Sequence, residues 1–341
     1  MCASSVPSLE TIPVPEIALP RQAVLLLAHG TPESLDQIPE YLRNITSGRP
    51  MPESVIEEIR HRYSLIGSSP LTALTLEQGR LLSQALALPV YVGMRNWKPY
   101  IADVVRQMRA DGITSAVAIC LAPQNSRTSV GLYRRAVFAE GAESIEIDFI
   151  DGWADHPQLT QAFAQRLQPV WQSVSAQIGS MAPVLFTAHS VPCKTIQTSE
   201  GEPAPDPYPV EAKRTAANVA ALLAPLGLTA ADWYFAFQSQ GMSGASWIGP
   251  TVEDTLTALR QEGHSAVVIH PIGFLCDHVE ILYDIDIAFR DFAGGIGLEV
   301  VRPQSLNDSP LLIAALEDLA RQGFARLAAK TPSASLAAPA V

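Results

Sequence analysis

The 341-residue sequence has few charged residues, and positive charge is the scarcer sign. Charged side chains make up 17% of the chain and apolar ones 48%, a balance that predicts a large buried core. It excludes a disordered or collagen-like protein. Lys and Arg number 23 against 34 Asp and Glu, so the formal net charge is −11. Such a chain has no overall field to attract nucleic acid or an anionic membrane surface, and we expect neither as a partner.

Cysteines and long apolar runs are also scarce. The four cysteines are too scattered for a disulfide framework, and no two form the C-x-x-C pair of a zinc ribbon or an ordinary iron–sulfur cradle. No apolar stretch reaches the roughly 18 residues that span a bilayer, and the first residues lack the features of a signal peptide. We expect a cytoplasmic protein with reduced thiols and no integral membrane segment.

Short apolar segments alternate with longer amphipathic ones, which predicts an α/β fold with parallel sheets covered by helices on both faces. Strands are predicted at residues 23–28, 88–94, 115–122, 144–150, 183–188, 232–239, 265–272 and 297–303. Helices are predicted at 54–66, 75–87, 101–112, 158–174, 209–227, 251–263 and 309–329, the last with Asp308 as its N-cap.

The chain also resembles itself at long range. AVLLLAHGTP (23–32) aligns with PVLFTAHSVP (183–192), and GITSAVAICLAP (112–123) resembles GHSAVVIHPIGF (263–274). This repeat predicts two similar Rossmann-like domains, each with a doubly wound parallel sheet, although any two buried strands can look alike.

The repeat and the composition together predict the domain organisation. We expect a disordered tail at 1–21, an N-terminal domain at 22–170, a C-terminal domain at 171–307, a closing helix at 308–328 that packs across the structure, and a second disordered tail at 329–341.

Three histidines, His29, His189 and His278, stand just past the apolar ends of predicted strands. The carboxyl ends of the strands form the ligand crevice of open α/β sheets, so these positions favour chemistry. A single such histidine could equally fix a turn by hydrogen bonding. Three at equivalent sheet edges favour a functional site.

The segment GFLCDHVEILYDID (273–286) carries the densest group of titratable residues. Asp277 and Glu280 form a D-x-x-E pattern that is typical of a helix capping box, which is the structural interpretation of Glu280. Glu280 and Asp284 are four residues apart and share a helix face, so a nearby cation would explain the like charges. One histidine with several carboxylates suits a loosely held divalent ion better than a closed zinc site.

Arginines lie beside serines and tyrosines in RHRYSLIGSSPL (60–71) and PQNSRTSVGLYRR (123–135). Arginines in an acidic protein often belong to solvated helix faces. At loop ends beside hydroxyl groups they could also bind the carboxylates of an organic acid, and composition alone favours neither interpretation.

Four segments together resemble the ferrochelatases, which insert ferrous iron into a porphyrin in haem biosynthesis. They are TAHSVP (187–192), DPYP (206–209), FQSQ…WIGP (237–250) and PIGFLCDHVEILYDIDI (271–287), within a resemblance that covers roughly residues 22–328. The resemblance implies a chelatase-like fold with two Rossmann-like domains flanking a porphyrin cleft. It also implies that the porphyrin and ferrous iron are the partners.

The same resemblance assigns candidate site residues. His189 matches the family's catalytic histidine and Glu280 its partnering glutamate, and the metal would meet His189, Glu280, Asp284 and His29. Soluble relatives usually carry a tyrosine at the position of His29, and Ala288 stands where an outer acidic ladder often continues. The substrate would be bound by His29, Thr31, Arg49, Arg62, Ser68, Ser69 and Tyr133.

The polar segment 45–58 stands where membrane-attached relatives have an apolar lip, and soluble short-lip forms commonly act on coproporphyrin III. We expect that substrate, with protoporphyrin IX as the alternative. The LLAHG start leaves open a cobalt or sirohydrochlorin chelatase, and a non-catalytic tetrapyrrole carrier is the alternative from another class. We expect no cofactor beyond the substrate Fe²⁺, no iron–sulfur cluster, and a monomer with transient contacts to neighbouring haem-pathway enzymes.

The chemistry of insertion explains these residue types. A porphyrin loses two pyrrole protons when a divalent metal enters, and histidine is a suited acceptor because its ordinary pKa of about 6.5 is close to working pH. Glu280 would stabilise the imidazolium that forms at His189.

Overall fold

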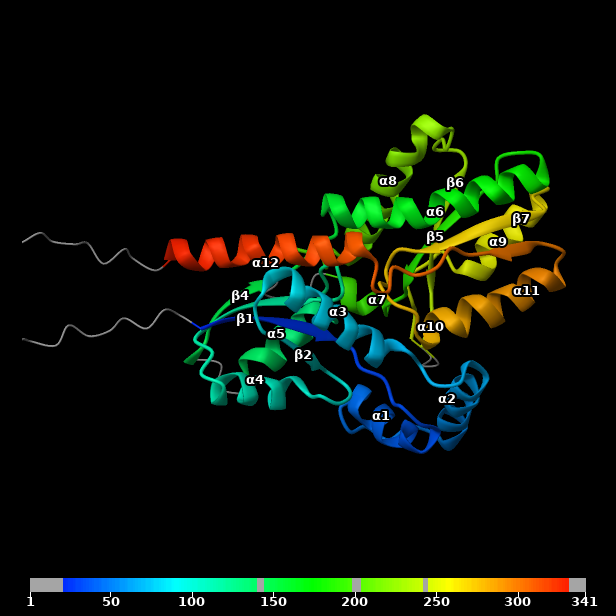
Figure 1. Cartoon of the computed structure of the whole chain (residues 1–341). Coiled ribbons are helices and arrows are strands. Elements are labelled where there is room, and N and C mark those ends of the chain that lie inside the picture. The colour runs from blue at the N-terminus through cyan, green and yellow to red at the C-terminus, as the bar shows by residue number, and fades with distance from the viewer. Residues whose placement is uncertain (1–20, 140–143, 198–203, 242–244, 331–341) are drawn as a thin grey trace, which may run out of the picture.

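A computed structural model describes residues 21–139, 144–197, 204–241 and 245–330 of the chain. Two four-stranded, all-parallel sheets form its centre, with helices on both faces (Figure 1). Within the described ranges the strands are β1 (Gln22–Ala28), β2 (Val90–Met94), β3 (Ser115–Cys120), β4 (Glu146–Ile150), β5 (Val184–His189), β6 (Trp233–Gln238), β7 (Ala266–Pro271) and β8 (Glu299–Val301). Each corresponds to one of the strands predicted from the sequence.

The α-helices connect and cover these strands. They are α1 (Ile38–Ile45), α2 (Glu53–Ile66), α3 (Leu71–Leu86), α4 (Ile101–Ala110), α5 (Val130–Phe138), α6 (Pro157–Ile178), α7 (Cys193–Ile196), α8 (Tyr208–Leu223), α9 (Val252–Gln261), α10 (Val279–Leu282), α11 (Arg290–Gly295) and α12 (Pro310–Lys330). The segments η1 (Leu35–Gln37) and η3 (Ala224–Leu226) are 3₁₀-helical, and η4 (Asp284–Phe289) is a π-helix. The sequence pattern predicted neither α1 nor α5, which are short, at 8 and 9 residues.

The two sheets repeat one topology. The first has the order β2-β1-β3-β4 and the second the order β6-β5-β7-β8, so β1 and β5 occupy equivalent places. His29 directly follows β1, and His189 is the last residue of β5. The internal repeat is therefore real at the level of structure, and it places these two histidines at equivalent sheet edges.

The central strands of the first sheet, β1 and β3, are buried on both faces, as their continuous apolar sequences predict. Side chains alternate across β1: Val24 and Leu26 pack into a core shared with the second half, whereas Leu25 and Leu27 pack under α4 and α5. Burying an aliphatic side chain of this size stabilises the fold by about 1.5–3 kcal/mol.

Helix α12 crosses back over the first sheet, where it packs on β3, β4, α3 and α6 (Figure 1). The close approach depends on Gly323, because a Cβ there would lie 2.6 Å from a methyl carbon of Val117. The predicted cap at Asp308 is wrong: the Ser309 hydroxyl accepts a hydrogen bond from the Leu312 amide at 3.3 Å and so caps the helix.

The predicted domain boundary near residue 170 lies within α6, which runs without a break to Ile178. The division into domains therefore stays a prediction. The tails expected at 1–21 and 329–341 lie almost wholly outside the described residues.

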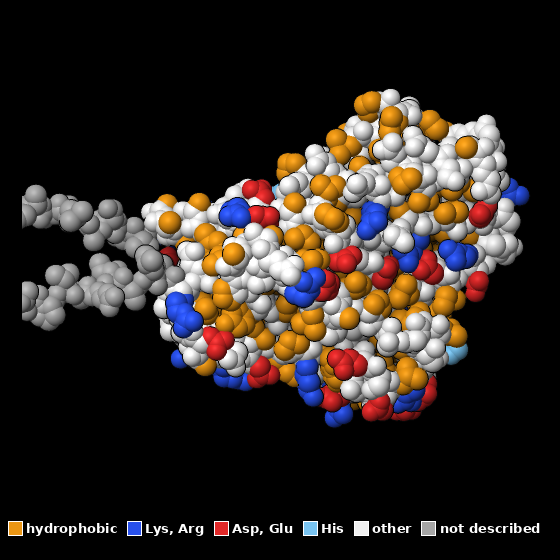
Figure 2. All heavy atoms as spheres, viewed as in Figure 1, with side chains coloured by type: hydrophobic (Ala, Val, Ile, Leu, Met, Phe, Trp, Pro, Cys, Tyr) orange, Lys and Arg blue, Asp and Glu red, His pale blue; other side chains and the backbone are white. Residues whose placement is uncertain are grey.

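Within the described ranges, no helix is both long and apolar enough to cross a bilayer. On the face drawn in Figure 2, acidic and basic side chains are interspersed, and no broad patch of one sign is visible.

Buried His270 on β7 is expected to make the protein acid-sensitive. The ring packs edge-on against Phe163 and Phe186, and no hydrogen bond of ordinary geometry reaches either nitrogen within the described residues. Burial lowers its pKa to about 3. The unfolded chain therefore binds this proton more readily, and stability falls as pH drops below about 6.5, by about 2 kcal/mol between pH 7 and pH 5.

Urea unfolding at these two pH values checks this, with His270→Leu as the test variant. The substitution should remove about 2 kcal/mol of the pH 5 penalty, whereas His61→Gln, at an exposed position, should leave the penalty unchanged. An equal loss in wild type and His270→Leu would show that this histidine is not responsible.

Candidate active site

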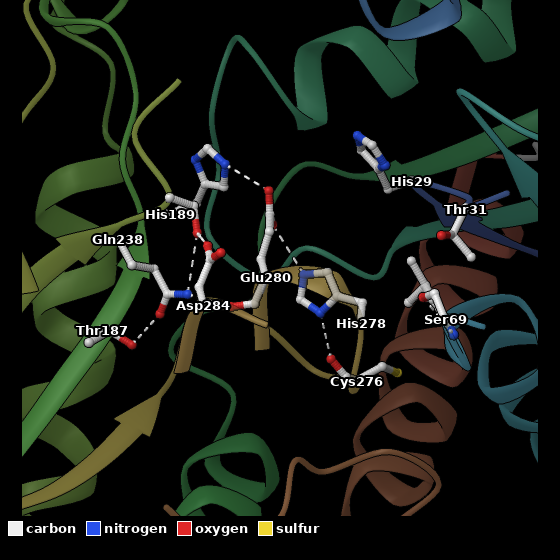
Figure 3. Close-up of polar contacts among 12 residues, drawn as sticks. His29, Thr31, Ser69, Thr187, His189, Gln238, Cys276, His278, Glu280 and Asp284 are labelled. Carbon is white, nitrogen blue, oxygen red and sulfur yellow. Dashed lines mark hydrogen bonds and ion pairs between the residues drawn. The ribbon is translucent and has the colours of Figure 1, made fainter. Parts of the chain in front are cut away.

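The ends of β5 and α10 are held together by a chain of buried polar groups (Figure 3). The Thr187 hydroxyl donates to Gln238 Oε1 at 2.6 Å, and Gln238 Nε2 donates to the Glu280 carbonyl at 2.7 Å. The Tyr208 hydroxyl donates to the His189 carbonyl at 2.8 Å. These contacts fix the backbone of His189 and Glu280 before any ligand binds.

Two imidazoles share the Glu280 carboxylate. His189 Nε2 lies 3.1 Å from Glu280 Oε1, and His278 Nε2 lies 3.1 Å from Glu280 Oε2. On the far side of each ring, Nδ1 meets a backbone carbonyl, that of Ser190 for His189 and that of Cys276 for His278. A carbonyl can only accept, so each Nδ1 carries a hydrogen and each Nε2 is the atom that faces the carboxylate.

This arrangement sets the charges in the group. Burial alone would lower the pKa of His189, but the neighbouring Glu280 carboxylate raises it to about 9. Burial alone would raise the pKa of Glu280, but the charges and hydrogen bonds of His189 and His278 hold it well below its ordinary range. At neutral pH in the empty site, His189 is therefore an imidazolium beside a carboxylate.

The capping-box interpretation of Glu280 is wrong. Asp277 accepts hydrogen bonds from the Ser305 hydroxyl at 2.7 Å and from Asn307 Nδ2 at 2.9 Å, and it pairs with Arg302 at 3.2 Å. Its carboxylate thus anchors the segment before α12 and does not cap α10. The Glu280 carboxylate takes no part in a capping box with Asp277, and its two oxygens contact His189 and His278 instead.

Asp284 follows α10 at the start of the π-helix, so the regular helix expected to join it to Glu280 is interrupted. Burial raises its pKa to about 6, opposed by a hydrogen bond from the Ser239 hydroxyl. Arg62 Nη1 lies 3.8 Å from Asp284 Oδ1, and its guanidinium stacks 5.0 Å from the centre of the Tyr283 ring. Arg62 Nε also donates to Glu58 Oε1 at 2.8 Å, so its charge is shared between Glu58 and Asp284, while His189 pairs with Glu280.

His29 lies opposite His189, with Glu280 between them in the view of Figure 3. Its Nδ1 donates to the Gly30 carbonyl at 3.1 Å, and its Nε2 lies 2.8 Å from Asn96 Nδ2. Burial, helped by the charge of Arg95, lowers the pKa of His29 to about 4, so the ring is neutral at pH 7. The turn after it requires glycine, because Gly30 has φ +81° and a Cβ would lie 2.9 Å from Trp97.

Three further predicted substrate residues are buried. Thr31 exchanges a hydrogen bond with the Tyr63 hydroxyl at 3.1 Å, and the Ser69 hydroxyl accepts from the Leu71 amide at 3.5 Å at the start of α3. Tyr133 lies on α5, with the Arg95 guanidinium 5.8 Å from the centre of its ring.

The two remaining ones, Arg49 and Ser68, are exposed on loops, and Arg49 donates to the Thr46 carbonyl at 3.1 Å. The structure therefore brings His189, Glu280, Asp284 and Arg62 together, with His29 facing them. It does not bring Arg49 or Ser68 into that group. Both stay predictions as substrate contacts.

Some residues of the site were not singled out from the sequence. Thr187, Tyr208 and Gln238 belong to the quoted motifs TAHSVP, DPYP and FQSQ, so those motifs were the available signal. For Asn96 the sequence offered no signal. Among the described residues, no three His, Cys, Asp or Glu side chains converge as ligands of one metal ion.

Comparison with known proteins decides the family. A sequence model of the ferrochelatase family matches residues 21–324. A ferrochelatase of Acidobacterium capsulatum is 67% identical over 317 residues, which cover 91% of this chain and 96% of the relative. The chain belongs to the ferrochelatase family. It is accordingly an enzyme that inserts a metal into a porphyrin.

More distant relatives also match the chain. A protein of Geobacillus thermodenitrificans named coproporphyrin III ferrochelatase is 34% identical over 314 residues, covering 89% of this chain and 96% of the relative. Among solved structures, SirB from Bacillus subtilis with Fe³⁺ superposes with a TM-score of 0.53 at 12% identity, covering 91% of this chain and 98% of SirB. That likeness shows a chelatase-like fold and no more, and it confirms the fold class predicted from the sequence.

Proposed function

We propose that this ferrochelatase inserts Fe²⁺ into coproporphyrin III between His189 and His29. The observation that carries the chemistry is the Glu280 carboxylate shared by two imidazoles. The names of the Geobacillus relatives support the choice of substrate, and the exposed Arg49 in the polar segment 45–58 offers a cation for a propionate.

The geometry of the shared carboxylate accounts for two protons. Each Nε2 contact with Glu280 is a hydrogen bond only when a proton lies in it, because a carboxylate oxygen and a ring lone pair both accept. With both rings neutral and Glu280 ionised, the group of His189, Glu280 and His278 has charge −1, and with both contacts protonated it has charge +1. Insertion of Fe²⁺ releases two pyrrole protons. Because His189 already carries one proton in the empty site at neutral pH, that proton must leave before the group can hold both.

Exposure assigns the order of transfer. The His189 side chain is 34% exposed and that of His278 only 13% exposed. His189 is therefore the ring that a porphyrin nitrogen can reach, and His278 receives a proton through Glu280. The hydrogen bond from each Nδ1 to a backbone carbonyl holds the ring, and so keeps the proton-accepting Nε2 in place during the reaction.

The raised pKa of His189 determines how proton transfer from the porphyrin begins. The ordinary value near 6.5 expected from the sequence is wrong for this ring, because the Glu280 carboxylate raises it to about 9. His189 must lose its own proton before it can accept one from the porphyrin. A ferrous ion approaching Asp284 favours that loss, because a dication repels the imidazolium.

His29 would meet the other face of the porphyrin. A neutral imidazole is a good ligand for iron, and the low pKa of His29 keeps the ring neutral at working pH. His29→Ala should therefore change the absorption spectrum of the enzyme-bound ferrous product and lower the rate only modestly. Anaerobic spectra of the two complexes check this; identical spectra would exclude axial ligation by His29.

An anaerobic assay with Fe²⁺, coproporphyrin III and protoporphyrin IX tests the substrate. We expect kcat/KM to be at least about tenfold higher for coproporphyrin III, which corresponds to one extra charged contact of about 1.4 kcal/mol. Arg49→Gln should reduce that preference. A higher kcat/KM for protoporphyrin IX would overturn the choice of substrate and leave iron insertion intact.

The same assay addresses the alternatives. Insertion of cobalt into sirohydrochlorin in preference to Fe²⁺ into either porphyrin would indicate the other chelatase class. Tight porphyrin binding without insertion would indicate a carrier. The monomeric state, the cytoplasmic location, the contacts with neighbouring haem-pathway enzymes and the absence of an iron–sulfur cluster stay predictions.

A further inference from the structure

The side chain of Asn96 is hydrogen-bonded to a ring nitrogen of His29. Asn96 follows β2, and its backbone amide donates to the His29 carbonyl at 2.9 Å while its side-chain Nδ2 reaches His29 Nε2 at 2.8 Å. Asn44 Nδ2 donates to the Asn96 carbonyl and to the Tyr100 hydroxyl, both at 3.0 Å, and so holds this loop. Only 2% of Asn96 is exposed, so its amide has little water to turn to.

These contacts determine the tautomer of His29. The Gly30 carbonyl can only accept, so the hydrogen of the neutral ring is on Nδ1, where the Tyr41 hydroxyl at 3.3 Å is a second acceptor. Nε2 then carries the lone pair, and that lone pair accepts a hydrogen from the Asn96 amide. A neutral imidazole has one lone pair with which to bind a metal, and in the empty site Asn96 occupies it.

We infer that Asn96 is a positioning residue that fixes the tautomer of His29 and competes with porphyrin-bound iron for His29 Nε2. The inference deepens the proposed function and rests on it. With the hydrogen on Nδ1, the lone pair that can bind iron is on Nε2. The hydrogen bond from Asn96 to Nε2 must break before an iron–nitrogen bond forms. The axial bond is weakened by the hydrogen bond it replaces, and the product is released sooner.

The first test examines the ring without any porphyrin. Nitrogen-15 NMR of the full chain should show His29 with its hydrogen on Nδ1 and a hydrogen-bonded lone pair on Nε2. Asn96→Ala should keep the hydrogen on Nδ1 but shift the Nε2 resonance to that of an unbonded nitrogen. In Asn96→Asp, which preserves size, the carboxylate should draw a hydrogen onto Nε2. A wild-type hydrogen on Nε2 would overturn the tautomer assignment and the inference with it.

The second test measures release of ferrous coproporphyrin III by stopped flow under anaerobic conditions. Asn96→Ala should slow release by roughly three- to tenfold, the worth of one hydrogen bond. Asn44→Ala is the matched control, since it loses contacts to the same loop but none to the ring, and its release rate should match wild type. Wild-type release from Asn96→Ala would contradict the competition.

The two proposals fail in different ways. If His29→Ala leaves the product spectrum unchanged, His29 is not an iron ligand and the competition falls, although iron insertion at His189 would stand. If His29 ligates the iron but Asn96→Ala releases product at the wild-type rate, the proposed function stands and the role of Asn96 is wrong.

Discussion

Replacing His189 by alanine is expected to lower kcat for iron insertion by about 10²- to 10⁴-fold, the usual contribution of a general base. The imidazole is the exposed member of the group that shares Glu280, and a methyl group can neither accept a pyrrole proton nor pass it inward. Porphyrin affinity should change little, because the porphyrin would be held mainly by its faces and carboxylates. Stopped-flow insertion rates and fluorescence titration with the porphyrin measure the two quantities separately.

The control for this variant is His270→Leu, which removes another histidine of the same sheet, one whose ring packs against Phe163 and Phe186. It should insert iron at the wild-type rate at pH 7. Normal turnover by His189→Ala would refute the assignment of the base. Loss of porphyrin binding in parallel with activity would instead show that His189 holds the porphyrin.

The second large effect concerns Glu280 and pH. Because the Glu280 carboxylate raises the pKa of His189 to about 9, the ring is protonated below that pH and cannot accept a proton. The value of kcat/KM should therefore rise about tenfold per pH unit up to pH 9 and then level off. Glu280→Gln removes the charge, so the pKa of His189 falls and the plateau begins at a lower pH.

The plateau of Glu280→Gln should also be lower, by roughly 10²-fold, because a neutral amide stabilises the imidazolium poorly and cannot pass a proton to His278. Anaerobic pH–rate profiles of both proteins give the comparison, with Glu299→Gln, at an exposed position, as the control. An unshifted rising limb in Glu280→Gln would mean that this carboxylate does not set the pKa of the base.

The fold was largely predictable because it rests on patterns of burial. The apolar runs that predicted strands at 23–28 and 183–188 became β1 and β5, and their common A-H-x-x-P continuation predicted equivalent places in two sheets. Local capping was less predictable. Ser309 and Asp308 are both good N-caps, and only the packing of α12 decides between them.

The site was predictable in its residue types but not in its electrostatics. The motif around Glu280 identified the carboxylate, yet the role of Asp277 depended on Ser305 and Asn307, which are distant in sequence. The pKa of His189 follows from an Nε2–carboxylate distance that no spacing in the sequence encodes. Asn96 belongs to no motif, and only its contact with the His29 ring reveals it.

The most direct test is a crystal structure of the full chain with metal-free coproporphyrin III bound. We predict a bent tetrapyrrole between the rings of His189 and His29, with His189 Nε2 within about 2.6–3.2 Å of a pyrrole nitrogen and His29 on the opposite face. A porphyrin bound elsewhere, or one separated from His189 by the Glu280 side chain, would contradict it.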